Sequence, residues 1–259
     1  CSPPQYLSSF IQTHTQTPMN QDSLKVRPKR GNLNHFSVLI SLLRDRRTFL
    51  EEVRGETKLE SKIVSLLFSS SFFFSVYGAI IGAYGGGLQI ISSAIKLPAL
   101  YLITLIICVP TLYFFDILFG SKLSFKQYIT MSLTSVSVIS VLLFSFAPVA
   151  LYFLISVKGY NFFLLLNVLV MALTGCVGVR LFYKGMVDMA GPDGFEHKLR
   201  LRLLRGWVFL YGLVGSQLGW TLRPFVGAEG EPFQIFRPEI DGNFYAQVIR
   251  SIGSMLGIN

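Results

Sequence analysis

The residues best suited to do chemistry lie inside long apolar runs. Residues 215–227, GSQLGWTLRPFVG, place Gln217, Trp220 and Arg223 within one short apolar segment. An amide, an indole and a guanidinium this close together suit a catalytic pocket, the lining of a pore, or the end of a membrane helix. Asn167 is a second amide within an apolar run. The elements that carry these residues decide between the three interpretations.

No sequence motif typical of catalysis accompanies these residues. The chain has no HExxH motif and no phosphate-binding glycine loop before a lysine, and the glycine-rich stretch GAYGGG at 82–87 follows an apolar run. The three cysteines lack metal-ligand spacing, and no histidine lies where it would ligate chlorophyll or haem within a span. We predict a non-enzyme without a metal site. Structural lipids are expected, and pigment held through water, a backbone carbonyl or an amide stays open.

The composition is that of a polytopic membrane protein. Hydrophobic residues make up 51% of the 259 residues and charged residues only 14%, against about 25% in soluble domains. The charged residues gather in residues 22–62 and 184–205 and are rare between them. A large soluble core does not separate charge in this way.

The apolar runs predict an all-α fold with about five transmembrane helices and flanking amphipathic surface helices. Each run reaches the roughly 20 residues that cross a bilayer core, and the expected spans are residues 63–84, 97–119, 128–157, 160–183 and 203–222. Residues 88–96 are too short to span and are expected at the membrane interface. Pro224 is expected to stop the last helix.

Four regions follow from these spans. Residues 1–31 are expected to be a disordered basic tail, with the remnant of an organellar transit peptide as an alternative. Residues 32–62 are expected to form an amphipathic surface helix, and residues 63–226 the five-span bundle. Residues 227–259 are expected to form a tail across the membrane with a short amphipathic helix, because apolar residues recur there at helical spacing: Phe244, Val248, Ile252 and Met255.

The distribution of lysine and arginine predicts the orientation. With five spans, 17 of the 23 Lys and Arg residues lie on the side of the N-terminus. This bias places the N-terminus in the cytoplasm, or in the stroma of a plastid, and the C-terminus across the membrane. A net charge of +9 on one membrane face fits anionic lipid or an acidic protein better than nucleic acid.

Small residues recur at helical spacing in two places. Gly78, Gly82 and Gly86 form two overlapping GxxxG patterns, and Gly215 and Gly219 form another. In lipid such patterns let helix backbones approach closely. We expect packing within this chain, with contact to another membrane protein as the alternative.

The segment GWTLRPF is interpreted as an interfacial stop. Trp220 reaches the headgroups as an anchor, Arg223 meets phosphate or a carboxylate of the tail such as Glu229 or Glu231, and Pro224 ends the helix. Gln217 and Asn167 are expected to bond neighbouring helices. If the chain instead transports a small solute or ion, Asn167 and Gln217 would line the path.

Three stretches carry a resemblance to known proteins: SSAIKLPALYLITLIICVPTLYFFDILFGSK, SVSVISVLLFSFAPVALYFLIS and FLYGLVGSQLGWTLRPFVG. Over residues 33–250 the chain resembles a family of uncharacterised multi-pass proteins of cyanobacteria and algal plastids. The five-span layout is also loosely similar to Yip-type membrane proteins. The resemblance implies a plastid or thylakoid membrane and carries no catalytic residue.

With that compartment, we expect a non-catalytic accessory or connector subunit of a thylakoid membrane assembly. It would stabilise contacts among membrane lipids and photosystem or antenna subunits. A small-solute or ion transporter or channel is the alternative function.

Overall fold

The computed structural model describes residues 35–157, 159–189, 195–227 and 244–255. The chain divides into two units, residues 1–32 and 33–259. The first unit, with the tail predicted over residues 1–31, lies outside the described residues. The described residues form helices and short turns, with no strand among them, so the all-α expectation is confirmed for them.

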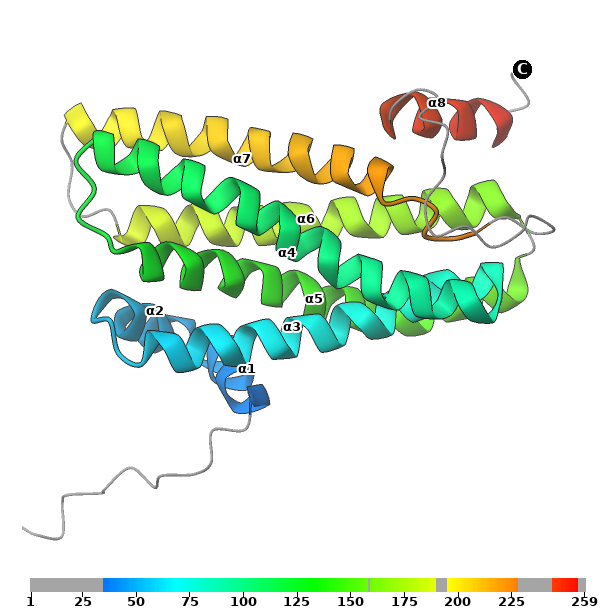
Figure 1. Cartoon of the computed structure of the whole chain (residues 1–259), viewed down its shortest axis with the longest axis horizontal. Helices are drawn as coiled ribbons and strands as arrows, with labels where there is room; N and C mark the ends of the chain where they lie inside the picture. Colours follow the sequence, from blue (N-terminus) through cyan, green and yellow to red (C-terminus); the bar gives the residue numbers. More distant parts are fainter. Residues whose placement is uncertain (1–34, 158, 190–194, 228–243, 256–259) are drawn as a thin grey trace, which may run out of the picture. The chain divides into compact units, whose positions relative to one another are not determined.

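Long helices run back and forth between two ends of the second unit, as Figure 1 shows. The elements are α1 (His35–Arg44), α2 (Arg46–Arg54), α3 (Leu59–Gly82), the single 3-10 turn η2 (Ala83–Gly85), α4 (Gly87–Leu118), α5 (Phe125–Ser156), α6 (Tyr160–Met189), α7 (Phe195–Thr221) and α8 (Phe244–Met255). We call the end where α3 and α5 begin the basic end. The opposite end, at the α3–α4 turn, is the corner end.

Within the described residues, four helices are long and apolar enough to cross a membrane: α3 with its 3-10 turn, α4, α5 and α6. The chain is therefore an all-α, multi-pass integral membrane protein. The expected fifth span, residues 203–222, is not among the four, although α7 has 27 residues. Glycines, Ser216 and Gln217 dilute the apolar content of α7, so hydropathy supports four spans and not five.

The structure corrects the expected interfacial segment at residues 88–96. These residues are the first turns of α4, and the helix continues through Pro98 and Pro110. Proline is tolerated inside membrane helices because neighbouring helices, Ser and Thr side chains or small local changes in helix geometry satisfy the carbonyl that it leaves free. The two spans predicted around this segment are therefore joined only by the Ala83–Gly86 turn.

The amphipathic region predicted as one helix forms two short helices, α1 and α2, separated at Asp45. The Asp45 carboxylate accepts hydrogen bonds from the Thr48 backbone N–H and, at 2.7 Å, from the Thr48 hydroxyl, so Asp45 caps α2. These bonds lower the pKa of Asp45 below its ordinary value. Phe49 and Val53 of α2 are buried, so this segment packs on the bundle.

The centre of the bundle is α5, which packs between α3 and α6. Residues 130–140 are buried without interruption. Small hydroxyl side chains occupy much of this stretch: Thr130, Ser132, Thr134, Ser135, Ser137 and Ser140. Small residues let membrane helices approach closely, which explains how α5 is covered on every side.

Candidate functional site

The end of the GWTLRPFVG segment is fastened to the start of α4. Gln89 Nε2 donates to the carbonyls of Pro224 at 2.7 Å and of Phe225 at 3.2 Å, and the Ser93 hydroxyl donates to the Phe225 carbonyl. Lys96 Nζ lies 3.3 Å from the Pro224 carbonyl oxygen. We call this set of bonds the latch. It provides donors for the carbonyls of Pro224 and Phe225, which lie in the segment after α7 and outside any helix.

Beside the latch, α3 and α4 are in close contact at two glycines of the predicted GxxxG pattern, Gly78 and Gly82. We call this contact the α3–α4 seam. A Cβ on Gly82 would lie 2.5 Å from the Gln89 carbonyl oxygen, and a Cβ on Gly78 would collide with the Ser93 carbonyl. Only glycine allows α3 and α4 to approach this closely. Within the described structure, Gly78 and Gly82 therefore pack against another helix of this chain. This is the interpretation of the GxxxG pattern that was favoured over contact with another membrane protein.

Gly86 does not have the helix-packing role that was expected of it. Its φ is +94°, and a Cβ placed there would meet nothing within 4 Å. The residue turns the chain between α3 and α4, a conformation that glycine adopts without cost. Gly215 and Gly219 do pack within the chain, since their Cβ positions lie 3.6 Å from Thr104 and 4.0 Å from Leu100 of α4.

The predicted anchor residues lie at the corner end. The Arg223 guanidinium is 3.5 Å from the centre of the Trp220 ring, a cation–π contact. Helix α7 ends at Thr221, two residues before the cis Arg223–Pro224 bond. Gln217 is half-buried on α7, and its backbone carbonyl accepts a bond from Thr221. Glu229 and Glu231, the acids proposed for Arg223, lie outside the described residues.

Asn167 joins two helices. The Tyr77 hydroxyl of α3 donates to Asn167 Oδ1 of α6 at 2.9 Å, and Asn167 Nδ2 donates to the Phe163 carbonyl at 2.8 Å. Both side chains are buried. Asn167 thus lies between α3 and α6, whereas Gln217 belongs to a helix that packs chiefly on α4.

Polar contacts at the basic end dock α2 onto the spans. Gln127 Nε2 donates to the last carbonyls of α2, at Val53 and Arg54. Arg46 donates to the Leu181 carbonyl of α6 at 3.1 Å. Lys62 pairs with Glu52 at 2.7 Å and lies over the Phe49 ring. The buried charge of Lys62 is therefore compensated by a neighbouring carboxylate and an aromatic face.

The carboxylate of Asp116 is held at the same end. It is buried near the end of α4 and accepts a hydrogen bond from the Tyr128 hydroxyl, which also contacts Ser121 Oγ at 2.7 Å. A carboxylate at a helix C-terminus is disfavoured by the helix dipole, and these hydroxyls offset that cost. The group joins α4 to α5.

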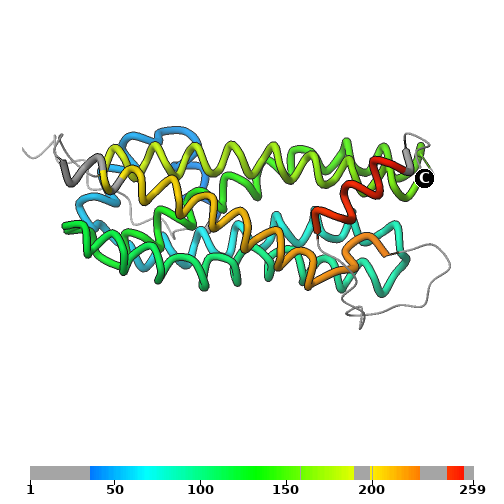
Figure 2. The backbone as a smooth tube through the Cα atoms, turned by 90° about the horizontal axis from the view of Figure 1, so that it is seen from above, coloured from blue at the N-terminus to red at the C-terminus, as the bar shows by residue number. Residues whose placement is uncertain are grey.

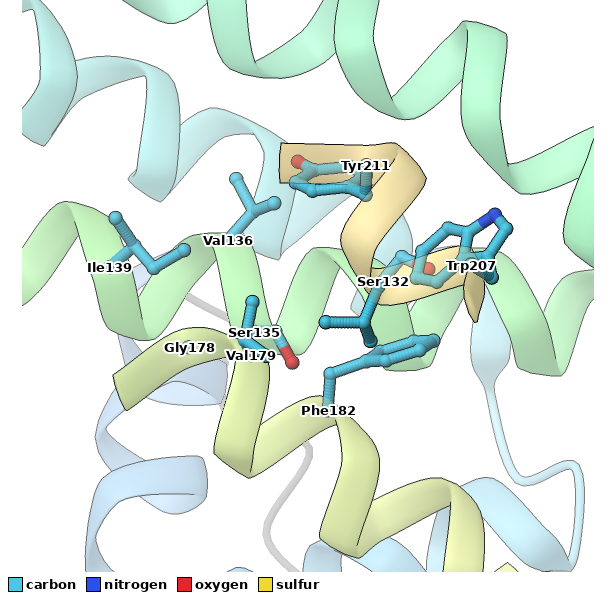
Figure 3. A pocket seen from close by; sticks show the side chains of 10 residues that line it. Ser132, Ser135, Val136, Ile139, Gly178, Val179, Phe182, Trp207 and Tyr211 are labelled. Carbon is cyan, nitrogen blue, oxygen red and sulfur yellow. The ribbon is translucent and has the colours of Figure 1, made fainter. Parts of the chain in front are cut away.

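A cavity of about 30 Å³ lies between α5, α6 and α7. Figure 3 shows the rings of Trp207 and Tyr211, from α7, close to the α5 and α6 side chains that complete the wall. Trp207 donates its indole N–H to the Cys108 carbonyl of α4 at 2.8 Å. The lining residues are Ser132, Ser135, Val136, Ile139, Gly178, Val179, Phe182, Trp207, Val208 and Tyr211.

Sequence reasoning missed the partners in these contacts. One helix face carries polar groups at helical spacing, at Gln89, Ser93 and Lys96. This pattern was overlooked because residues 88–96 were expected at the membrane interface and not in a span. Tyr77 and Tyr211 have no local signal, because a tyrosine in a span equally suits lipid. Their roles depend on helix neighbours far away in the sequence.

Comparison with protein-family models, with curated proteins and with solved structures gave no match to this chain.

Proposed function

We propose that this chain is a non-catalytic accessory or connector subunit of a thylakoid membrane assembly, such as a photosystem or light-harvesting supercomplex. The observation that carries the proposal is the use of polar groups inside the membrane. Asn167, Gln89 and Ser93 all bond another helix or its end. Such groups strengthen a scaffold, whereas a catalytic or transporting protein directs polar groups toward a substrate.

The proposed assembly partners are membrane lipids and other membrane proteins. The outer surface offers large apolar side chains on several helices, such as Phe114 at 62% and Phe209 at 74% exposure. These side chains suit lipid tails and the apolar spans of neighbouring subunits. The thylakoid location rests on the resemblance of residues 33–250 to plastid and cyanobacterial proteins.

We further propose that α7 is a fifth crossing, with the N-terminus in the stroma and the C-terminus in the lumen. Trp207 bonds Cys108 of α4, and the segment after α7 bonds Gln89. These contacts on α4 are separated by about 28 Å at about 1.5 Å per residue, close to the roughly 30 Å of a hydrocarbon core. Figure 2 shows α7 running obliquely from the basic end toward the corner end.

Native separation of the source membranes tests the accessory function. Gentle solubilisation, separation by size and mass spectrometry would identify what co-migrates with the chain. Stoichiometric co-migration with a photosynthetic complex is expected. Migration alone or as a small homo-oligomer would contradict the proposal.

Transport of a small solute is a second candidate. The cavity between α5, α6 and α7 favours it, but the cavity is lined by neither Asn167 nor Gln217, the two residues expected on a transport path. Replacing Asn167 and Gln217 by leucine separates the two functions. Flux into reconstituted vesicles that these changes abolish would support transport. If the chain is a scaffold, neither the parent protein nor the leucine variants show flux, and the Gln217→Leu protein stays in its assembly.

A further inference from the structure

The break between α1 and α2 separates an apolar helix from a charged one. No residue from Phe36 to Leu43 carries a charge, whereas five of the nine residues of α2 do. Helix α1 is apolar on both sides, since Leu39 is buried against the bundle and Ile40 on the opposite side is 61% exposed. A helix that is apolar on its outer side suits hydrocarbon and not water. The two helices therefore belong to different layers of the membrane.

Aromatic contacts place α1 at the depth of the hydrocarbon core. The centre of the Phe36 ring lies 6.4 Å from that of Phe68 and 5.8 Å from that of Phe72, both on α3. These two α3 side chains are about half exposed on the outer surface of the span. Phe72 is about 20 Å along α3 from Leu59, at about 1.5 Å per residue. Helix α1 therefore enters the bilayer beside the first span, and its end at Asp45 lies nearer the headgroups.

Basic side chains gather where α1 meets α2, at residues 44–47, which we call the elbow. Arg46 Nη2 donates to the Leu181 carbonyl of α6 at 3.1 Å and so holds the elbow against that helix, beside which Figure 2 shows α1 and α2. The residues that flank this contact on both elements are basic and exposed: Arg44, Arg47, Arg180 and Lys184. The elbow and α6 therefore present positive charge together.

This positive charge is not neutralised within the described part of the chain. Residues 44–51 and 180–188 contain five basic and three acidic residues. The ion pairs that the described residues form lie elsewhere at the basic end, from Lys62 to Glu52 and from Lys126 to Glu60. Of the three acids near the elbow, Asp45 is engaged in the cap of α2, and none forms an ion pair. An excess of cations near headgroup depth favours an anionic lipid.

We propose that the elbow binds the headgroup of an anionic phospholipid. Arg47, Arg180 and Lys184 donate to its phosphate, and its acyl chains lie along the outer side of α1 at Ile40 and Leu43, which are 61% and 52% exposed. Hydrogen bonds between basic side chains and phosphate are charge-assisted and strong. A zwitterionic lipid makes the same acyl-chain contacts but leaves the excess charge without a partner, so the site selects its lipid by headgroup charge.

Native mass spectrometry of the full chain in detergent micelles tests the site. The protein is titrated with dioleoylphosphatidylglycerol, which is anionic, or with dioleoylphosphatidylcholine, which is zwitterionic. We expect the first anionic lipid to bind at least about fivefold more tightly. The triple variant Arg47→Gln, Arg180→Gln and Lys184→Gln should raise the Kd of the anionic lipid at least about tenfold, because each cation near the membrane surface contributes about fivefold.

A second triple variant is the matched control: Lys58→Gln, Lys122→Gln and Lys126→Gln. It removes the same amount of charge from exposed residues of the same end, near the starts of α3 and α5 and away from the elbow. We expect it to change the Kd less than about twofold. Equal weakening by the two triple variants, or equal affinity of the parent for the two lipids, would overturn the proposal. Thermal unfolding confirms that each variant is folded.

Spin labels test the depth that the proposal requires. In a cysteine-free background, labels at Ile40→Cys and Glu51→Cys report from the exposed sides of α1 and α2 in vesicles that contain phosphatidylglycerol. We expect the label at residue 40 to collide more with oxygen and the label at residue 51 more with a water-soluble nickel chelate. Greater access of the chelate at residue 40 would place α1 in water and overturn the proposal. The lipid site does not depend on the accessory function, which co-migration tests separately.

Discussion

The two interfaces made by α4 and by α7 differ in how completely they are closed. At the α3–α4 seam, Gly78 and Gly82 meet backbone atoms of the facing helix, and Gln89 and Ser93 are hydrogen-bonded. Between α7 and the α5–α6 pair, a cavity remains and two hydroxyls lack partners. Small and polar residues line both regions.

The difference shows that residue type alone does not make a membrane interface tight. Glycine closes an interface only when the facing residue presents backbone at the same level, as Gln89 and Ser93 do. Gly178 also faces α5, but it meets the flexible end of the Ile139 side chain. The first arrangement fixes two helices by backbone contact, whereas the second relies on a side chain that can move aside, and a small cavity remains beside it.

The largest expected effect comes from adding a methyl group at the seam. Gly82→Ala puts a Cβ 2.5 Å from the Gln89 carbonyl oxygen and 2.9 Å from Ile90 Cα. Backbone cannot move aside cheaply, so we expect a loss of about 1–3 kcal/mol in the free energy of unfolding. Denaturant titration in detergent micelles measures it.

Gly212→Ala is the matched control, because its Cβ would meet nothing within 4 Å. It should be neutral or slightly stabilising, since alanine favours helix over glycine. Equal stability of the Gly82→Ala and Gly212→Ala proteins would contradict the tight seam.

The next effect comes from breaking the latch. Gln89→Leu keeps the size of the side chain but removes the donor to the Pro224 and Phe225 carbonyls. We expect a loss of about 1 kcal/mol for the hydrogen bond and faster proteolysis after Thr221. Thr111→Val, which removes an exposed hydroxyl bonded within its own helix, is the control. Unchanged proteolysis in Gln89→Leu would show that the latch does not hold this segment.

A smaller effect is expected at the cavity. Ser132→Ala and Tyr211→Phe remove hydroxyls that have no partner, so we expect unfolding free energies within about 0.5 kcal/mol of the parent. Ser137→Ala is the comparison, because Ser137 bonds Leu66 across the α3–α5 interface at 3.3 Å, and it should lose more. A larger loss in Ser132→Ala than in Ser137→Ala would mean that Ser132 is satisfied within the protein.

The smallest expected effect is a pH dependence of stability that comes from the cap of α2, outside the two interfaces compared above. The bonds from Thr48 lower the pKa of Asp45 below its ordinary value of 3.8. Ionised Asp45 therefore contributes stability above about pH 4, and the contribution is lost as pH falls through the lowered pKa. The difference in melting temperature between the parent and Asp45→Ala should shrink from pH 7 to pH 3. A constant difference over that range would contradict the cap.

Hydropathy was sufficient to predict most of the fold. The starts and ends of α5 and α6 lie near the predicted bounds, and the pattern at Phe244 and Val248 predicted α8. The hydropathy pattern failed at residues 88–96. This apolar stretch looks too short to cross a bilayer when it is taken to end before Pro98, although the helix continues through that proline. It also counted α7 as a span, although α7 is not among the four helices that are long and apolar enough to cross a membrane, so a fifth crossing depends on the contacts of α7 with α4.

The candidate site was less predictable for a physical reason. GxxxG spacing indicated a close approach at Gly78 and Gly82, but the facing residues Gln89 and Ser93 depend on the register of two helices. Asn167 was expected to bond a neighbouring helix, yet its partner, Tyr77, is 90 residues away in the sequence. A cavity depends on the distances between three helices, which no local pattern encodes.

The central structural proposal is that α7 crosses the membrane, because this crossing brings the segment after α7 to the latch at the corner end and places α8 opposite the turn before α3. In a cysteine-free background, Thr57→Cys marks the turn before α3, and Arg250→Cys marks α8. Both positions are exposed. Labelling with a membrane-impermeant maleimide in sealed vesicles should modify these two cysteines from opposite sides of the membrane. Labelling of both from the same side would contradict the five-crossing arrangement.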